Sequence, residues 1–385
     1  MRRTVFYLPG FDPRGAKFYH RLYREQAEKQ QSVNGLAINV GKRGRIDNAE
    51  HQWRVSARDK DGGNADVDYH YLAWDDIVRM HWVKSPVSIL LGAFRAFKVF
   101  VLSGGVVRGA RLNRYTVITL LYPLLFIFFG LALMILLSLV VFIIVPEAYR
   151  FGSVVPMGLL WYFGYPFWVR IGDRINAFWL LRIDLFIDAW VHVGDAKLES
   201  RLDQFSARIA EELSNSAGKE VVIIGHSVGA ILLVPVLARL KQRGIDLSRL
   251  RIITLGHCTP LVLELRASYR YETDVREVAA TKGLEWYDFS AARDGASFFG
   301  LSPLYRPERA GEAQSKVRCY SARFHTLFSQ SDYAELRKDR YRMHFQYLMA
   351  TDRPGLMDYF RFTAGPQSIP EQFKMSSDQP LIKSS

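Results

Sequence analysis

The chain has 385 residues, of which 49% are hydrophobic, enough for one large domain or two of ordinary size. Its 51 Lys and Arg residues against 38 Asp and Glu give a net charge of +13, but many of the basic residues precede a long apolar run, so we expect a membrane lipid surface and no nucleic acid as partner. The only two cysteines, Cys258 and Cys319, form neither a disulfide framework nor a metal-ligand spacing, which predicts a reducing compartment, no metal and no cofactor.

The N-terminal part alternates strand and helix signals. Residues 4–8 predict a buried strand, a turn cluster rich in Pro and Gly follows, and residues 16–30 predict a helix. The N-terminus lacks the long apolar stretch of a signal peptide. Further strand-like runs occupy residues 36–40, 53–57 and 67–74. This pattern is typical of an α/β domain.

Residues 77–146 contain no Asp or Glu. The apolar stretch 87–102 is interrupted by Arg95 and Lys98, which predicts either a basic amphipathic helix at a membrane interface or a helix buried in the domain. Residues 115–145 carry no charge at all. Because a spanning helix needs about 20 apolar residues, we expect this run to cross the membrane.

A second uncharged run, residues 151–169, is just long enough to span, with a re-entrant or surface-lying segment as the alternative. Arginines flank the outer ends of both runs, whereas the loop between them has only Arg150 beside Glu147. The positive-inside rule therefore predicts two spans, with the tip outside and both outer ends in the cytoplasm. Residues 175–193 predict an amphipathic helix at the bilayer surface or under the domain, and not a third span.

The motif Gly225-His226-Ser227-Val228-Gly229 follows four β-branched residues and precedes an apolar helical run. A strand, a sharp turn and a helix are the context of a nucleophile elbow. Its strained turn requires small residues two before and two after the serine, and Gly225 and Gly229 meet that need. We therefore expect Ser227 to be a nucleophile. The alternative is an ordinary glycine-rich turn in which Ser227 caps the helix.

The later strands supply an acid and a base in the order that such enzymes use, Ser, then Asp or Glu, then His. Asp288 lies inside the strand predicted at 284–289, Asp294 lies in the loop after it, and His325 directly follows the strand predicted at 316–324. We expect His325 to be the base because it ends the last strand. The other histidines considered for this role are His226, His257 and His344.

From residue 195 to about 350, together with the first strand, the chain resembles an α/β-hydrolase. The resemblance implies that Asp294, in the loop after its strand, is the triad acid, with Asp288 as the alternative. It places the oxyanion-hole donors on the backbone N–H of Val228 and of about Phe11. Pro9 stands where family members often carry histidine, which leaves the backbone donor intact.

These expectations give an α/β-hydrolase-like, mostly parallel sheet with helices on both faces and an inserted transmembrane hairpin. The predicted parts are an N-terminal half-domain at 1–110, the membrane insertion at 111–192, a C-terminal half-domain at 193–352 and a mobile tail at 353–385. The predicted function is a membrane-anchored serine hydrolase that cleaves an ester or thioester, including a lipid-like acyl substrate. The alternative is a catalytically inactive module of the same fold that binds or scaffolds at the membrane.

Overall fold

A computed structural model of the chain describes all residues except 113, 216–217, 264–268, 306–316, 377–379 and 382–385, and it describes no side chain at 111–116. The chain divides into two compact units, each described separately. Unit 1 comprises Met1–Met80 and Val191–Ser385, and unit 2 comprises His81–Trp190. Unit 2 is thus an insertion in the sequence of unit 1, and it begins earlier than the residue 111 expected from the sequence.

The strands of unit 1 form one mostly parallel sheet in the order β2-β4-β5-β1-β6-β7-β8-β9, with β3 paired to β4. Strand β1 pairs in parallel with β5 and β6, and the pairs from β6 to β9 are also parallel, whereas β2, β3 and β5 each pair antiparallel with β4. The strands are β1 (Arg2–Leu8), β2 (Ala37–Val40), β3 (Gly44–Arg45), β4 (Glu50–Arg58), β5 (Asn64–Leu72), β6 (Glu220–His226), β7 (Leu250–Leu255), β8 (Glu285–Ser290) and β9 (Val317–Ser321).

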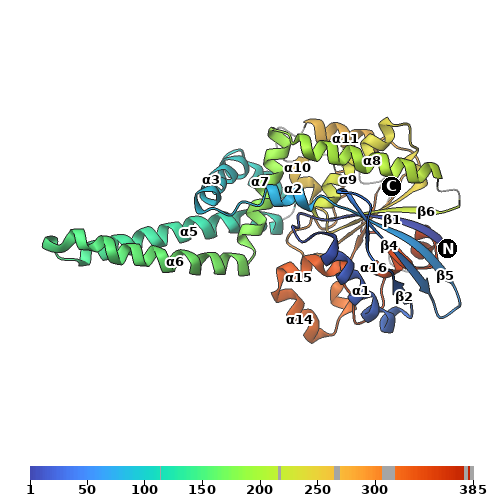
Figure 1. Ribbon diagram of the computed structural model, residues 1–385, viewed down its shortest axis with the longest axis horizontal. Helices are drawn as coiled ribbons and strands as arrows, with labels where there is room; N and C mark the ends of the chain where they lie inside the picture. Colours follow the sequence, from blue (N-terminus) through green and yellow to red (C-terminus); the bar gives the residue numbers. More distant parts are fainter. Residues whose placement is uncertain (113, 216–217, 264–268, 306–316, 377–379, 382–385) are drawn as a thin grey trace. The chain divides into compact units, whose positions relative to one another are not determined.

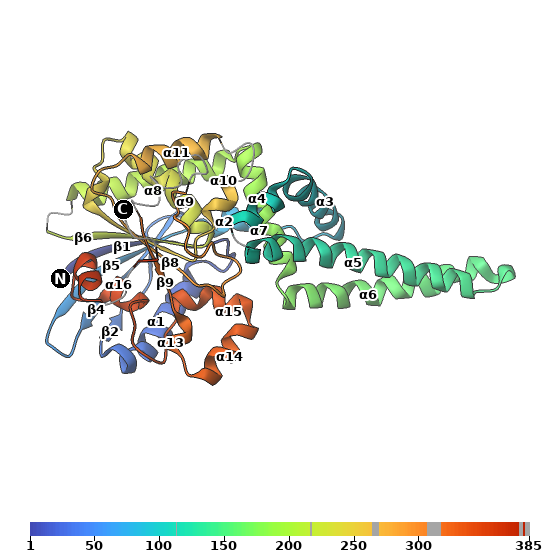
Figure 2. The same ribbon diagram turned by 180° about the vertical axis from the view of Figure 1, so that it is seen from behind.

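Helices cover both faces of this sheet. Helices α8, α9 and α11 lie on one face, and α1 and α16 lie on the other (Figures 1 and 2). The helices of unit 1 are α1 (Gly15–Asn34), α2 (Asp75–Met80), α8 (Ala196–Asn215), α9 (Val228–Gln242), α10 (Thr259–Leu263), α11 (Tyr269–Ala279), α13 (Phe324–Leu327), α14 (Gln330–Lys338), α15 (Arg340–Phe345), α16 (Tyr359–Ala364) and α17 (Ile369–Lys374). The prediction of a mixed α/β fold with a mostly parallel sheet is confirmed.

The strand β6 lies near the middle of the sheet. Its residues Val221, Val222, Ile223 and Ile224 are all buried, because a parallel strand covered by helices on both faces needs a nearly continuous apolar run. Its neighbours β1 and β7 end in register with it, so that Leu8 pairs with Gly225 and Leu255 with His226. The carboxyl ends of the parallel strands therefore meet at one edge of the sheet, where ligand sites form in such folds.

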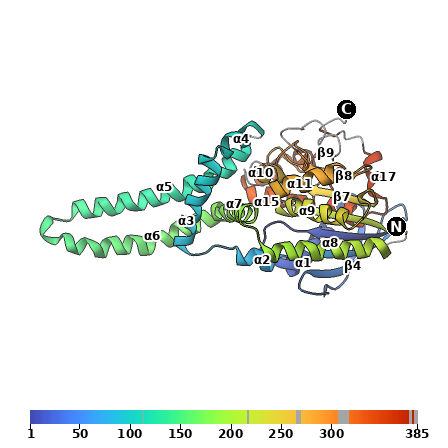
Figure 3. The ribbon, with the colours of Figure 1, turned by 90° about the horizontal axis from the view of Figure 1, so that it is seen from above.

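Unit 2 is helical, and its helices α5 and α6 lie side by side (Figures 1 and 3). Among the described residues one helix is long and apolar enough to cross a membrane, Val117–Ile144, with a mean hydropathy of 3.1 and little of its surface buried. The second expected span corresponds to α6, which does not meet the same criterion. The helices of this unit are α3 (Pro86–Ala96), α4 (Gly105–Leu112), α5 (Arg114–Ile144), α6 (Val154–Arg174) and α7 (Ala177–His192), with a π-helical turn (Phe97–Leu102) and a 3₁₀ segment (Glu147–Ser153).

Helix α3, within the stretch 87–102, has one buried face and one exposed face. One face is buried and packs on α7, where a methyl group at Gly92 would stand 2.5 Å from Leu185. An ion pair between Arg95 and Asp188 joins the same two helices. On the other face, Val87 and Phe94 are exposed. The helix is therefore anchored in unit 2 and still presents apolar side chains outward.

The mobile tail expected after residue 352 is instead packed on unit 1 as far as α17. Tyr359, Phe360 and Phe362 of α16 are buried, and Phe373 of α17 stacks on Tyr287 of β8 with ring centroids 3.9 Å apart. The polar composition and prolines of this segment suggested a tail. Its aromatic residues hold it on unit 1 instead, because burying each aromatic ring stabilises the packed arrangement.

Arg3 of β1 holds this C-terminal segment to the sheet. Its buried guanidinium donates to Glu220 of β6 and to the carbonyl oxygens of Phe362, Gly365 and Gln367, at 2.7–3.1 Å. Removing one partner of a buried ion pair leaves the other charge uncompensated. This arginine therefore joins two strands and the C-terminal segment at a single point.

We predict that Arg3→Met destabilises the protein by about 3 kcal/mol or more, because it leaves Glu220 and three carbonyl groups without this donor. Chemical denaturation followed by tryptophan fluorescence measures the effect. The matched control is Arg21→Met on α1, an exposed residue 3.8 Å from Glu25, which should cost about 0.5 kcal/mol or less. Equal losses in the two variants would contradict the assigned role.

Candidate functional site

Ser227 stands at the turn between β6 and α9 with φ 55° and ψ −123°. A positive φ is unusual for a residue with a side chain, and the surrounding structure must hold it. Here the Ser227 N–H donates to the Leu255 carbonyl at 3.0 Å. A methyl group at Gly225 would stand 2.9 Å from the Ala230 Cα, and one at Gly229 would stand 2.1 Å from the Leu8 carbonyl oxygen. Neither position has room for a side chain, as the motif predicts.

The loop after β1 reaches this turn. A methyl group at Gly10 would stand 3.0 Å from the Ser227 Cβ and 3.5 Å from its Oγ. The Trp74 indole N–H donates to the Pro9 carbonyl at 3.0 Å and fixes the loop. Phe11 follows in this loop and is buried, and Val228 is the first residue of α9. The two expected oxyanion-hole donors therefore belong to the two segments that meet at Ser227.

The structure pairs Asp294 with His344. The His344 Nδ1 lies 3.0 Å and 2.9 Å from the two carboxylate oxygens of Asp294. The same carboxylate accepts from the Tyr347 hydroxyl at 3.0 Å and from the Ala296 N–H at 3.1 Å. Because a carboxylate only accepts hydrogen bonds, it holds the proton of the imidazole on Nδ1 and directs Nε2 to the other side.

The environment keeps Asp294 ionised. Burial opposes the charged form, but the neighbouring His344, through its charge and its hydrogen bond, and the donors from Ala296 and Tyr347 outweigh it. Together they lower the pKa of the Asp294 carboxyl below its ordinary value. A buried, ionised carboxylate against a histidine is the arrangement that orients a general base.

His325 does not take this position. It lies on the short helix α13, exposed, with its ring 6.2 Å from that of Tyr333. Strand β9 ends at Ser321, earlier than expected, and Arg323 then adopts φ 47° before the helix starts. The buried side chains of this helix are Phe324 and Leu327. The expected base therefore points to solvent, and the histidine that meets Asp294 comes later in the chain, from α15.

Asp288 occupies a separate buried cluster. Its carboxyl accepts from the Thr254 hydroxyl at 2.6 Å, and its other oxygen lies 3.6 Å from the His257 Nε2. That ring nitrogen donates to the Leu301 carbonyl at 2.9 Å. Burial raises the pKa of Asp288 well above its usual range, and burial lowers the pKa of His257 to about 4. Burial thus disfavours the charged form of both groups, and the geometry favours Asp294, which contacts His344, as the acid.

His226, the residue before Ser227, contacts α15. Its Nε2 donates to the His344 carbonyl at 3.0 Å, and the two rings lie 5.1 Å apart. Burial, with the charge of His344, lowers the pKa of His226 to about 3, so it remains a neutral donor. The turn thus contacts the helix that carries His344, although the Ser227 hydroxyl makes no hydrogen bond within the described residues. Such bonds often form only when substrate binds.

Sequence reasoning placed His344 among several candidates and missed Tyr347 and Arg14. Arg14 donates to Asp12 and to the hydroxyl of Tyr341 on α15, and its guanidinium lies 5.0 Å from the Phe345 ring. It therefore joins the loop after β1 to α15, the helix that carries His344. A sequence signal did exist, because His344 stands between two apolar residues in a run that favours burial over an exposed histidine.

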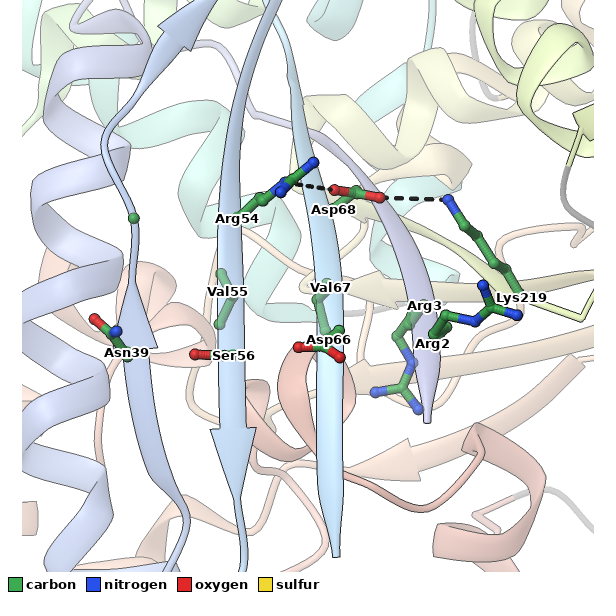
Figure 4. Close-up of a pocket in the computed structure, with 11 residues that line it drawn as sticks. Arg2, Arg3, Asn39, Arg54, Val55, Ser56, Asp66, Val67, Asp68 and Lys219 are labelled. Carbon is green, nitrogen blue, oxygen red and sulfur yellow. Dashed lines mark hydrogen bonds and ion pairs between the residues drawn. The ribbon is translucent and has the colours of Figure 1, made fainter.

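A cavity of about 580 Å³, with charged residues among those that line it, lies at the amino end of β1, and Figure 4 shows its lining residues. Arg54 and Lys219 both pair with Asp68 there, at 3.8 Å and 3.4 Å. Ser227 follows the carboxyl end of the parallel strand β6. This cavity therefore belongs to the opposite edge of the sheet from the candidate site.

No family model, no curated protein and no solved structure matches this chain. Its function must therefore be argued from the geometry of the site.

We predict that Asp294→Asn slows the reaction of Ser227 with a fluorophosphonate by about 10³-fold or more, since the amide would place the histidine proton on the wrong nitrogen. The matched control is Asp288→Asn, which replaces a buried carboxyl that contacts Thr254 and His257. It should change the rate less than about threefold. Labelling rates measured at pH 7 decide between the two acids, and the reverse ranking would contradict the assignment.

The base is tested in the same assay. We predict that His344→Ala reduces labelling by about 10³-fold or more because the serine loses its proton acceptor. His325→Ala should leave the rate within about twofold, since its side chain is exposed and away from Asp294. Thermal unfolding confirms that both variants are folded. Loss of labelling in His325→Ala alone would restore the assignment made from the sequence.

Proposed function

We propose that this protein is a membrane-anchored serine hydrolase of the α/β-hydrolase type that cleaves an ester or thioester through an acyl-enzyme on Ser227. The observation that carries the proposal is the buried Asp294–His344 pair, at the same edge of the sheet as a serine held at φ 55°. Three residues in the chain order Ser, Asp, His support it, with His344 in the role first expected of His325.

In the proposed reaction the Ser227 Oγ attacks the carbonyl carbon of the substrate and passes its proton to the His344 Nε2. The carbonyl oxygen becomes an oxyanion, which the backbone N–H groups of Val228 and Phe11 stabilise. The intermediate then expels the alcohol or thiol, which takes the proton from His344. Water repeats the sequence on the acyl-enzyme, with His344 again as base, and releases the acid.

The membrane part of the proposal rests on α5. Its segment Val117–Ile144 has the length and apolarity of a span, and α6 packs beside it, with the Trp168 ring stacked on Phe126 at 4.2 Å. We propose that α5 and α6 form a hairpin whose tip faces outward, and that unit 1 faces the cytoplasm. Arginines at the outer ends support this orientation. An enzyme so anchored meets acyl esters of lipids readily, which supports a lipid-like substrate.

A fluorophosphonate tests the proposal directly. The full-length protein should be labelled, mass spectrometry should place the adduct on Ser227, and Ser227→Ala should reduce labelling to background because the nucleophile is lost. Ser32→Ala, an exposed serine on α1, is the control and should be labelled like the wild type. Labelling that persists in Ser227→Ala would contradict the proposed nucleophile. A wild-type protein that neither labels nor cleaves p-nitrophenyl esters would favour the non-catalytic module.

A further inference from the structure

An apolar groove lies within unit 2, where α3, α5, α6 and α7 meet. Its volume is about 550 Å³, within the range of roughly 300–1,000 Å³ that is usual for ligand sites. None of the described residues that line it carries a charge. Apart from the hydroxyls of two tyrosines and the indole N–H groups of two tryptophans, its lining side chains are apolar, and such a space favours an apolar occupant.

Glycines determine where the groove opens. The Trp168 ring lies over Gly130, where a methyl group would stand 2.1 Å away, and Met134 lies similarly close to Gly164. At these points α5 and α6 are in close contact. Gly158 also lines the groove, but a methyl group there would meet no atom within 4 Å. The space beside Gly158 is therefore open.

The polar atom of one lining side chain is satisfied inside the protein. The Trp161 indole N–H donates to the Ser138 hydroxyl at 2.9 Å, and that hydroxyl donates to the Met134 carbonyl at 2.8 Å. The indole therefore presents its apolar ring to the groove without an unpaired N–H. A hydrocarbon chain can lie against this wall at no cost in hydrogen bonds.

The groove is continuous with the proposed membrane surface. Its residues Ile127, Leu131 and Met134 belong to the apolar segment Val117–Ile144, on which Phe129 and Ile135 are exposed. On the membrane-facing helices the solvent is lipid, and the components that fit an apolar groove there are acyl chains. Continuity with this surface identifies the occupant as lipid rather than a soluble ligand.

Cationic residues adjoin, along the chain, residues that line the groove. Phe178 lines the groove, and Arg182 follows it one helical turn later on α7. The Arg182 Nε donates to the Val83 carbonyl at 2.8 Å, and its guanidinium lies 4.6 Å from the centre of the Trp82 ring. Lys84 stands next to these residues, two positions before α3 begins. Cations beside an apolar groove suit a lipid with a phosphate headgroup.

We propose that this groove binds one acyl chain of a bilayer phospholipid, with the phosphate toward Arg182 and Lys84. The lipid is a resident ligand of unit 2 and differs from any substrate of Ser227. The inference rests on the membrane anchoring proposed above and does not depend on the hydrolase chemistry.

The test uses the full-length protein in vesicles of phosphatidylcholine and phosphatidylglycerol. They contain a phospholipid that carries a diazirine midway along one acyl chain. After irradiation, peptide mass spectrometry should find adducts concentrated on Leu131, Met134 and Tyr162. Gly158→Leu fills the open space and should reduce these adducts by about fivefold or more. Gly152→Leu is the matched control, since a methyl group there also meets no atom within 4 Å, and it should leave them unchanged.

Several outcomes would overturn the site. These are adducts spread evenly over the exposed face of α5, equal yields in the two glycine variants, cross-links only to a second copy of the chain, or labelling by a diazirine fatty acid but not by the phospholipid. Circular dichroism and vesicle flotation check that both variants fold and bind. A protein that does not float with vesicles would overturn the membrane anchor and this site together, whereas the labelling of Ser227 would still report on the hydrolase proposal.

Discussion

The candidate site depends on the hydrogen bonds that the buried carboxylate of Asp294 accepts. Asp294 lies in the loop after β8, yet it accepts from His344 and Tyr347, which come from the C-terminal helices. Gly256, at the end of β7, adopts φ 56°, and a methyl group there would stand 2.8 Å from the Tyr347 ring and 3.2 Å from an Asp294 oxygen. Three separate parts of the chain are thus fitted around one charge, which burial alone would neutralise.

The sequence predicts a feature of the site when the residues that cause it lie close together in the chain, and it fails when they lie far apart. The elbow was predictable because its causes lie within ten residues, in a β-branched strand and two glycines. The place of Asp294 was predictable because it lies in the loop that follows a strand. The histidine that pairs with Asp294 was not predictable, since β9 leads through α13 and α14 before α15 brings His344 to this carboxylate. Of the several histidines, His344 reaches Asp294 because α15 packs against Arg14 and His226. Both residues are far from α15 in the sequence.

Unit 2 shows the same contrast. The long charge-free run gave α5 directly, because length and composition suffice to recognise such a helix. The boundary of the unit was not recoverable, since it depends on α3 packing against α7 through Gly92 and the pair of Arg95 with Asp188. The C-terminal segment was misjudged for a related reason. Its prolines and polar residues are visible locally, whereas the strands that its aromatic rings cover are not.

The central place of β1 has a consequence for how the chain folds during synthesis. This first strand pairs on one side with β5, which lies within the first 72 residues, and on the other side with β6, more than 200 residues later in the chain. Until then a bare parallel edge of apolar strand is exposed while the whole of unit 2 is produced. Such long-range pairing is slow, and an unpaired edge invites aggregation. Delivering the nascent chain to a bilayer during that interval would keep the waiting edge apart from other copies.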